Sequence, residues 1–80
     1  MMVQAFFKKG AVGVRHSHPH RQVTYVEKGI FEVEIDGKKE ILRPGDSFMV
    51  PAHVEHGAVA LADGILIDVF TPARTDFLND

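Results

Sequence analysis

The sequence contains no cysteine among its 80 residues. This excludes disulfide bonds and thiolate zinc sites, so any metal ion would bind imidazole, carboxylate, amide or water oxygen. No apolar run approaches the ~20 residues that a membrane helix needs. The net charge of −2 means that the chain lacks the excess of positive charge that is typical of nucleic-acid-binding domains. The opening residues MMVQAFFKK lack the features of a signal peptide. We therefore expect a cytoplasmic protein with neither nucleic acid nor membrane as a partner.

The length bounds the size of the core. Eighty residues predict one domain over residues 1–80. A chain this short buries only about 60–65% of the surface that it exposes when unfolded. Such a thin core often depends on a metal ion or a partner chain for additional stability.

Helical periodicity is hard to find, and short runs typical of strands take its place. Asp36-Gly37 predicts a two-residue hairpin turn, because both central positions of such a turn need a positive φ. Residues 73–80 read as a tail or one helical turn. The predicted strands are Met1–Phe7, Val23–Val26, Phe31–Ile35, Lys38–Leu42, Ser47–Val50, Ala58–Leu61 and Ile65–Phe70.

Short strands separated by turn signals every 8–12 residues predict an all-β sandwich or barrel. A full barrel of this type needs about eight strands, and the pattern supplies six or seven. Strands from a partner chain could complete it, or the sequence could be an N-terminally short version of a larger domain. We expect the Met1–Lys8 strand to pair across a homodimer or to lie on a shared interface, because unpaired strand edges must be covered.

Three of the five histidines lie in the segment HSHPH, residues 16–20. His16 and His18 are two residues apart, so on an extended chain both side chains project from one face. Gln22 has the same parity, and His56 near the start of a later strand supplies a third imidazole. Three imidazoles and an amide oxygen suit a first-row metal ion. A polar loop is the alternative reading of HSHPH. His20 is better read as solvated or as a neighbour of the ligands.

The spacing of these residues resembles the two-part signature of the cupin family. The sequence departs from that signature at His53, where glycine is usual, at Ala60, where asparagine is usual, and at Gln22, where glutamate is usual. The resemblance implies a cupin jelly-roll barrel, or double-stranded β-helix. It also implies one divalent transition metal ion (Ni, Zn, Fe or Mn) bound by His16, His18, Gln22 and His56. The matching positions are Gly10, His16, His18, Gln22 and Gly29 in the first part, and Gly45, Pro51 and His56 in the second.

The end of the chain carries a second group of candidate residues. Asp68 shares one face of its strand with Leu66 and Phe70. An acid in an apolar strand is unfavourable unless it is paired or used, so Asp68 is either a paired carboxylate at the barrel mouth or a general acid/base. Phe70 is either core or substrate contact. Arg74 is either a solvated tail residue or a fork for a substrate carboxylate.

The segment DVFTPAR, residues 68–74, together with HSHPHRQ and TDFL, resembles the KdgF branch of small cupins. That resemblance implies ring opening of 4,5-unsaturated uronates from pectin or alginate, giving the linear 5-keto-4-deoxyuronate. It assigns turnover to Asp68, Phe70 and Arg74. Two alternatives stay open: a dioxygenase using Fe²⁺ or Cu²⁺ on the same ligands, and a non-catalytic sugar-binding cupin module.

Overall fold

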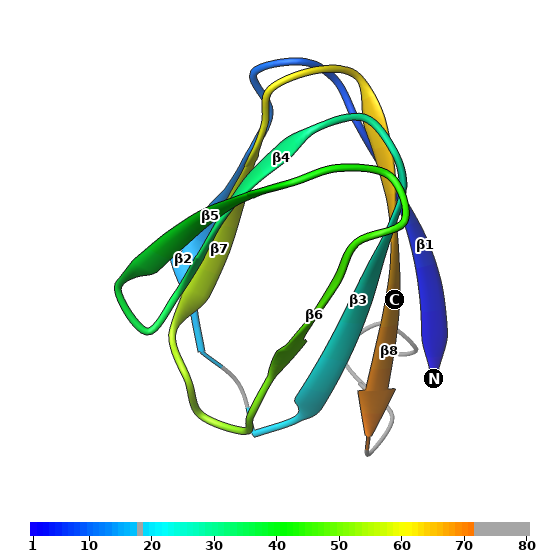
Figure 1. The fold of residues 1–80 in the computed structure, drawn as a ribbon. Coiled ribbons are helices and arrows are strands. Elements are labelled where there is room, and N and C mark those ends of the chain that lie inside the picture. The colour runs from blue at the N-terminus through cyan, green and yellow to red at the C-terminus, as the bar shows by residue number, and fades with distance from the viewer. Residues whose placement is uncertain (18, 72–80) are drawn as a thin grey trace.

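The computed structural model describes residues 1–17 and 19–71. These residues form eight β-strands (Figure 1). No helix within them is long and apolar enough to cross a membrane. The strands are β1 (Met2–Phe7), β2 (Val12–His16), β3 (Arg21–Lys28), β4 (Phe31–Ile35), β5 (Lys38–Leu42), β6 (Ser47–Val50), β7 (His56–Ala60) and β8 (Gly64–Thr71).

The strands form two four-stranded sheets with the orders β1-β8-β3-β6 and β2-β7-β4-β5. All pairs within them are antiparallel. Most successive strands along the chain alternate between the sheets, which face each other around a common interior (Figure 1). This is jelly-roll topology, so the predicted all-β jelly-roll barrel is confirmed.

The count of six or seven strands was wrong, because β2 (Val12–His16) was missed. Its sequence VGVRH combines a glycine with charged and polar residues, which disfavours a strand on local pattern alone. Pairing with β7 holds the segment in the sheet, with a register shift between Gly13 and His16. A tertiary contact therefore overrides a weak local signal.

The first strand finds its partner within the same chain. β1 pairs with β8 along its whole length, from Met2 opposite Val69 to Phe7 opposite Gly64. Pairing with β8 uses one side of β1, and the expectation that this strand pairs across a homodimer or lies on a shared interface stays a prediction. Its other side is an edge of the sheet.

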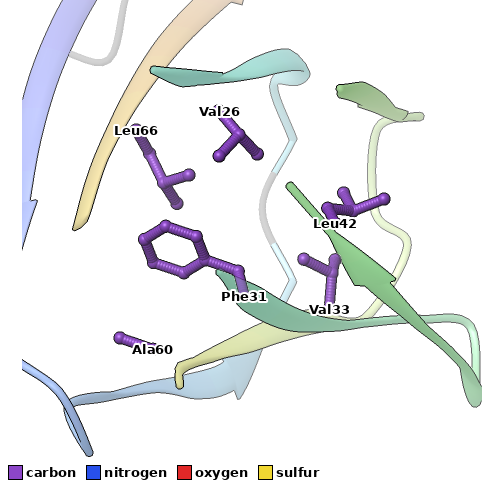
Figure 2. Packing of buried hydrophobic residues seen from close by; sticks show 6 residues of the cluster. All are labelled: Val26, Phe31, Val33, Leu42, Ala60 and Leu66. Carbon is purple, nitrogen blue, oxygen red and sulfur yellow. The ribbon is translucent and has the colours of Figure 1, made fainter. Parts of the chain in front are cut away.

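The largest cluster of buried apolar side chains lies between the two sheets. Figure 2 shows six buried side chains that meet from both sheets. The ring of Phe31 is fully buried and meets that of Phe7 edge-on, with centroids 5.4 Å apart. This packing stabilises the half of the barrel where β8 begins. The cluster consists of Val26, Phe31, Val33, Leu42, Ala60 and Leu66.

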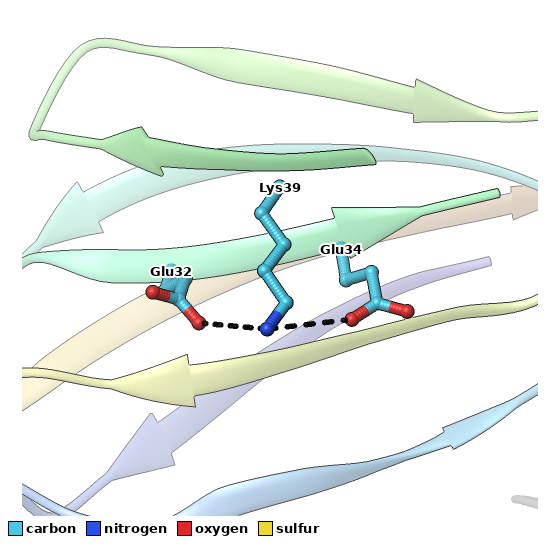
Figure 3. Close-up of polar contacts among 3 residues, drawn as sticks. All are labelled: Glu32, Glu34 and Lys39. Carbon is cyan, nitrogen blue, oxygen red and sulfur yellow. Dashed lines mark ion pairs between the residues drawn. The ribbon is translucent and has the colours of Figure 1, made fainter. Parts of the chain in front are cut away.

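Strand β4 shows why the alternation in the sequence predicts its faces. Phe31 and Val33 point inward, whereas Glu32 and Glu34 lie on the outer surface. Lys39 of β5 lies between the two glutamates, with its Nζ 4.0 Å from a carboxylate oxygen of each (Figure 3). Exposed pairs of this kind contribute only about 0.2–1 kcal/mol each, so the inward residues decide the position of the strand.

Two turns have the backbone geometry that their residues require. Asp36 and Gly37 have φ values of 51° and 80°, which confirms the predicted hairpin turn between β4 and β5. Gly29 has φ 88°, and a Cβ there would lie 2.6 Å from the Asp63 carbonyl oxygen. Only glycine therefore lets the β3–β4 and β7–β8 turns cross this closely at the core end of the barrel.

Candidate functional site

A cavity of about 200 Å³ lies between the two sheets, toward the end of the interior where β3 begins and β8 ends. Its lining comes from both sheets. Polar and aromatic side chains from β3, β7 and β8 meet there, so strands far apart in sequence share one site. Four of the seven predicted site residues line it, namely Gln22, His56, Asp68 and Phe70.

His56 is held as a nitrogen ligand would be. Its side chain is 5% exposed, and its Nδ1 lies 2.9 Å from the carbonyl oxygen of Val54. A carbonyl only accepts hydrogen bonds, so Nδ1 carries the proton. The lone pair of a neutral ring is then on Nε2, which is the arrangement that metal-binding histidines use.

His16 lies beside His56 in the backbone. The two are Cα partners in the β2–β7 pairing. This pairing places the backbone of His56 beside the first residue of the segment HSHPH. His20 is half-buried, as its reading as a neighbour of the ligands allows.

Two of the predicted site residues, His18 and Arg74, lie outside the described residues. Within residues 1–17 and 19–71, no group of three or more His, Cys, Asp or Glu residues is gathered in metal-binding geometry. The four-ligand set and the carboxylate clamp are therefore predictions. Of that set, His56 and Gln22 line one cavity.

Asp68 is bound to two neutral side chains of β3. The Thr24 hydroxyl donates to Asp68 Oδ1 at 2.6 Å, and Gln22 Nε2 donates to the same oxygen at 3.2 Å. Gln22 Nε2 also donates to Thr24 Oγ1 at 2.7 Å. We call these three residues the Gln22–Thr24–Asp68 network. It connects a predicted metal ligand to the predicted acid/base.

Thr24 is the site residue that the sequence analysis missed. It is fully buried and lies directly opposite Asp68 in the β3–β8 pairing. The sequence could have indicated Thr24 through its position two residues after Gln22 on the same strand, because residues two apart in a strand share one face, here the inner one. No motif marks it, since a threonine in a strand is ordinary.

Phe70 is a core residue that also borders the cavity, and its contact with a substrate stays a prediction. It is 4% exposed and therefore part of the core, and it also lines the cavity. Its backbone lies opposite Gln22 in the β3–β8 pairing. The ring thus forms an apolar wall close to the polar network.

Donor chemistry in the cavity fits a divalent metal ion. The hydrogen bond to Val54 leaves Nε2 as the metal-binding nitrogen of the His56 imidazole, and the hydrogen bond to Thr24 uses the nitrogen of the Gln22 amide rather than its oxygen. Both are ordinary ligands for first-row metals, and neither carries a charge that would need a second partner. The implied metal and the described residues therefore agree.

The same fold occurs in known proteins. Residues 4–70 match the family described as "Cupin domain". The chain belongs to the cupin family. Within it, this cupin is 50% identical over 80 residues to the pectin degradation protein KdgF of Dickeya dadantii (strain 3937), covering 98% of this chain and 73% of the relative.

Two solved cupins superimpose closely on this one. An RmlC-like cupin from Shewanella frigidimarina NCIMB 400 has a TM-score of 0.95 and 56% identity, covering 96% of this chain and 69% of its own. KdgF from a Halomonas species has a TM-score of 0.94 and 51% identity, covering 96% and 72%. The present chain is thus a cupin of the KdgF type, as the resemblance of its motifs indicated.

Proposed function

We propose that this cupin opens the ring of 4,5-unsaturated uronate monosaccharides and releases the linear 5-keto-4-deoxyuronate. The observation that carries the proposal is the meeting of Gln22, His56, Asp68 and Phe70 at one cavity in a chain half identical to a pectin degradation protein. The cavity of about 200 Å³ is smaller than the ~300–1,000 Å³ of pockets for drug-sized ligands, so a monosaccharide is a suitable occupant.

The reaction is an isomerisation with no redox change. A base takes the proton of the anomeric hydroxyl, the bond between C1 and the ring oxygen breaks, and that oxygen leaves as an enol. Protonation at C4 converts the enol to the C5 ketone, so the atoms of substrate and product are the same. One acid/base, one Lewis acid and one carboxylate clamp are sufficient for this sequence.

Asp68 suits the proton transfers, because its carboxylate lies on the cavity wall and is oriented by Thr24. Phe70 provides an apolar surface against the sugar ring. Arg74 is assigned to the substrate carboxylate, which a guanidinium binds as a bidentate fork. His16, His18, Gln22 and His56 are assigned to one divalent ion (Ni, Zn, Fe or Mn), which when bound polarises a substrate oxygen.

Oxygen uptake and ultraviolet absorbance together test the proposal. A ring-opening enzyme removes the absorbance of the conjugated enol-ether acid without consuming oxygen. Oxygen consumption would instead support the dioxygenase alternative on the same ligands. A cupin that binds the uronate and leaves its absorbance unchanged would be a sugar-binding module.

A homodimer is part of the proposal, with one cupin domain over residues 1–80 as its unit. An apolar row crosses the outer face of the β1-β8-β3-β6 sheet, because Met2 pairs with Val69, Val69 with Val23, and Val23 with Met49. These four side chains are 40–72% exposed in the monomer. A continuous exposed apolar surface of this kind commonly marks a protein interface, and a second copy offers a matching one.

A further inference from the structure

The Gln22–Thr24–Asp68 network has a direction that follows from counting protons. An ionised carboxylate only accepts hydrogen bonds, and a hydroxyl has one proton to donate. The 2.6 Å separation of Thr24 Oγ1 and Asp68 Oδ1 is the short distance of a charge-assisted bond, so the threonine proton is directed at Asp68. Thr24 Oγ1 can then only accept from Gln22.

This requirement fixes the amide of Gln22. The terminal atom 2.7 Å from Thr24 Oγ1 must be the nitrogen, because an oxygen there would face an oxygen without a proton between them. The second contact of the same nitrogen, 3.2 Å from Asp68 Oδ1, imposes the same orientation. The amide oxygen, which is the atom that binds metal ions, is therefore the other terminal atom.

We propose that Thr24 is a positioning residue that orients the Gln22 amide for metal binding, and that Asp68 requires an amide rather than a carboxylate at residue 22. The inference rests on the proposed function, which assigns Gln22 to the metal ion. The carboxylate that Gln22→Glu introduces would compete with Asp68 for the single proton of Thr24. The present side-chain atoms Gln22 Nε2 and Asp68 Oδ1 are 3.2 Å apart, a separation at which two negative charges repel strongly.

Burial makes the network sensitive to such a change. Thr24 is fully buried and Gln22 is 7% exposed. Water therefore has little access to replace a lost hydrogen bond or to screen two like charges. A merely structural threonine in a strand would not influence which atom of Gln22 is presented to a ligand.

The first experiment measures Ni²⁺ affinity by isothermal titration calorimetry in the absence of any uronate. Thr24→Val keeps the shape and removes the hydroxyl, and we expect the affinity to fall about 10–100-fold, the usual effect of losing a group that orients a metal ligand. Thr24→Ser retains the hydroxyl and should stay within a few-fold of the wild type. Thr71→Val, at an exposed threonine of β8, is the control and should leave the affinity unchanged. A folded Thr24→Val protein that binds Ni²⁺ like the wild type would overturn the positioning role.

A double-mutant cycle of Gln22→Glu and Asp68→Asn tests the same network and can be used even if Thr24→Val does not fold. Thermal unfolding is measured on metal-free protein with a chelator present. Gln22→Glu should lower Tm by about 4–8 °C or more through repulsion from Asp68. Adding Asp68→Asn should restore most of this loss, because the asparagine amide donates to the new carboxylate. If the effects of Gln22→Glu and Asp68→Asn simply add, the inference is wrong.

Neither experiment contains the uronate. If both experiments give the expected results and the wild-type protein does not open the uronate ring, the proposed function is refuted and the inference about Thr24 stands. If the wild-type protein opens the ring and Thr24→Val binds Ni²⁺ with the wild-type affinity, the role of Thr24 is refuted and the proposed function stands.

Discussion

At the scale of single residues, Asp68 is the carboxylate that the proposed chemistry depends on. Asp68→Ala removes the proposed acid/base, so kcat for uronate opening should fall by ~10²–10⁴ when the protein is saturated with metal. The same change leaves the buried Thr24 hydroxyl without its acceptor, which costs about 1–3 kcal/mol of stability. Rates must therefore be measured on protein shown to be folded by circular dichroism. Unchanged kcat in the folded variant would remove Asp68 from the mechanism.

Replacement of Arg74 should cause a different kinetic defect from replacement of Asp68. As a clamp for the substrate carboxylate, its replacement in Arg74→Ala should mainly raise KM, with a smaller effect on kcat. Arg74→Lys should recover only part of the loss, because an ammonium group cannot form the bidentate fork of a guanidinium. Steady-state kinetics on the three proteins give both constants. Equal KM values in all three would show that Arg74 does not contact the substrate.

The residue scale also shows what the sequence could and could not predict about the site. Gln22, His56, Asp68 and Phe70 were predicted from spacing, strand parity and a family resemblance, and all four line the cavity. Thr24 was not, since its importance lies in facing Asp68 across β3 and β8. A cross-strand neighbour depends on sheet register between distant segments, which a single sequence does not state.

At the scale of elements, the turn before β7 contains a residue in a strained conformation. His53 has φ 65°, in the left-handed region, at the position where the cupin signature usually has glycine. His53→Gly should therefore stabilise the protein by about 0.5–1 kcal/mol. This net value is the strain energy removed from the left-handed conformation, reduced by the greater conformational entropy that glycine gives the unfolded chain.

Ala52→Gly is the matched control for this turn. Ala52 precedes His53 and is not among the described residues with positive φ. Glycine there brings only unfolded-state flexibility and should lower stability by about 0.4–1 kcal/mol. Urea unfolding of both variants measures the two effects. Stabilisation by Ala52→Gly equal to that by His53→Gly would show that the φ of His53 is not strained.

The strands themselves show where local pattern is enough. Phe31–Ile35, Lys38–Leu42 and Ser47–Val50 were predicted with their observed bounds, because alternation and turn chemistry agree there. β2 was missed because its glycine and polar residues carry no such pattern, and only its pairing with β7 makes it a strand. A strand that is stabilised mainly by pairing with a distant segment cannot be predicted from its local sequence pattern.

At the scale of the whole molecule, the proposed homodimer can be tested through the apolar row on the β1-β8-β3-β6 sheet. Val23 lies within that row and is 46% exposed. Val23→Lys should convert a dimer to a monomer at micromolar concentration, because an interface that buries an unpaired charge is strongly weakened.

Val12→Lys is the control, since Val12 is 62% exposed on the other sheet. It should leave the assembly unchanged. Sedimentation velocity of the three proteins decides the question. A wild-type monomer, or a Val23→Lys protein that stays dimeric, would contradict this interface.

The most direct test of the whole account is a proton NMR time course of 4,5-unsaturated galacturonate mixed with the metal-loaded protein. The account predicts that the vinyl proton signal at C4 disappears far faster than in protein-free buffer, while signals of the linear 5-keto-4-deoxyuronate grow in equal amount. It also predicts that Asp68→Ala loses most of this acceleration. A vinyl signal that decays at the protein-free rate with folded, metal-loaded wild-type protein would contradict the proposed ring opening.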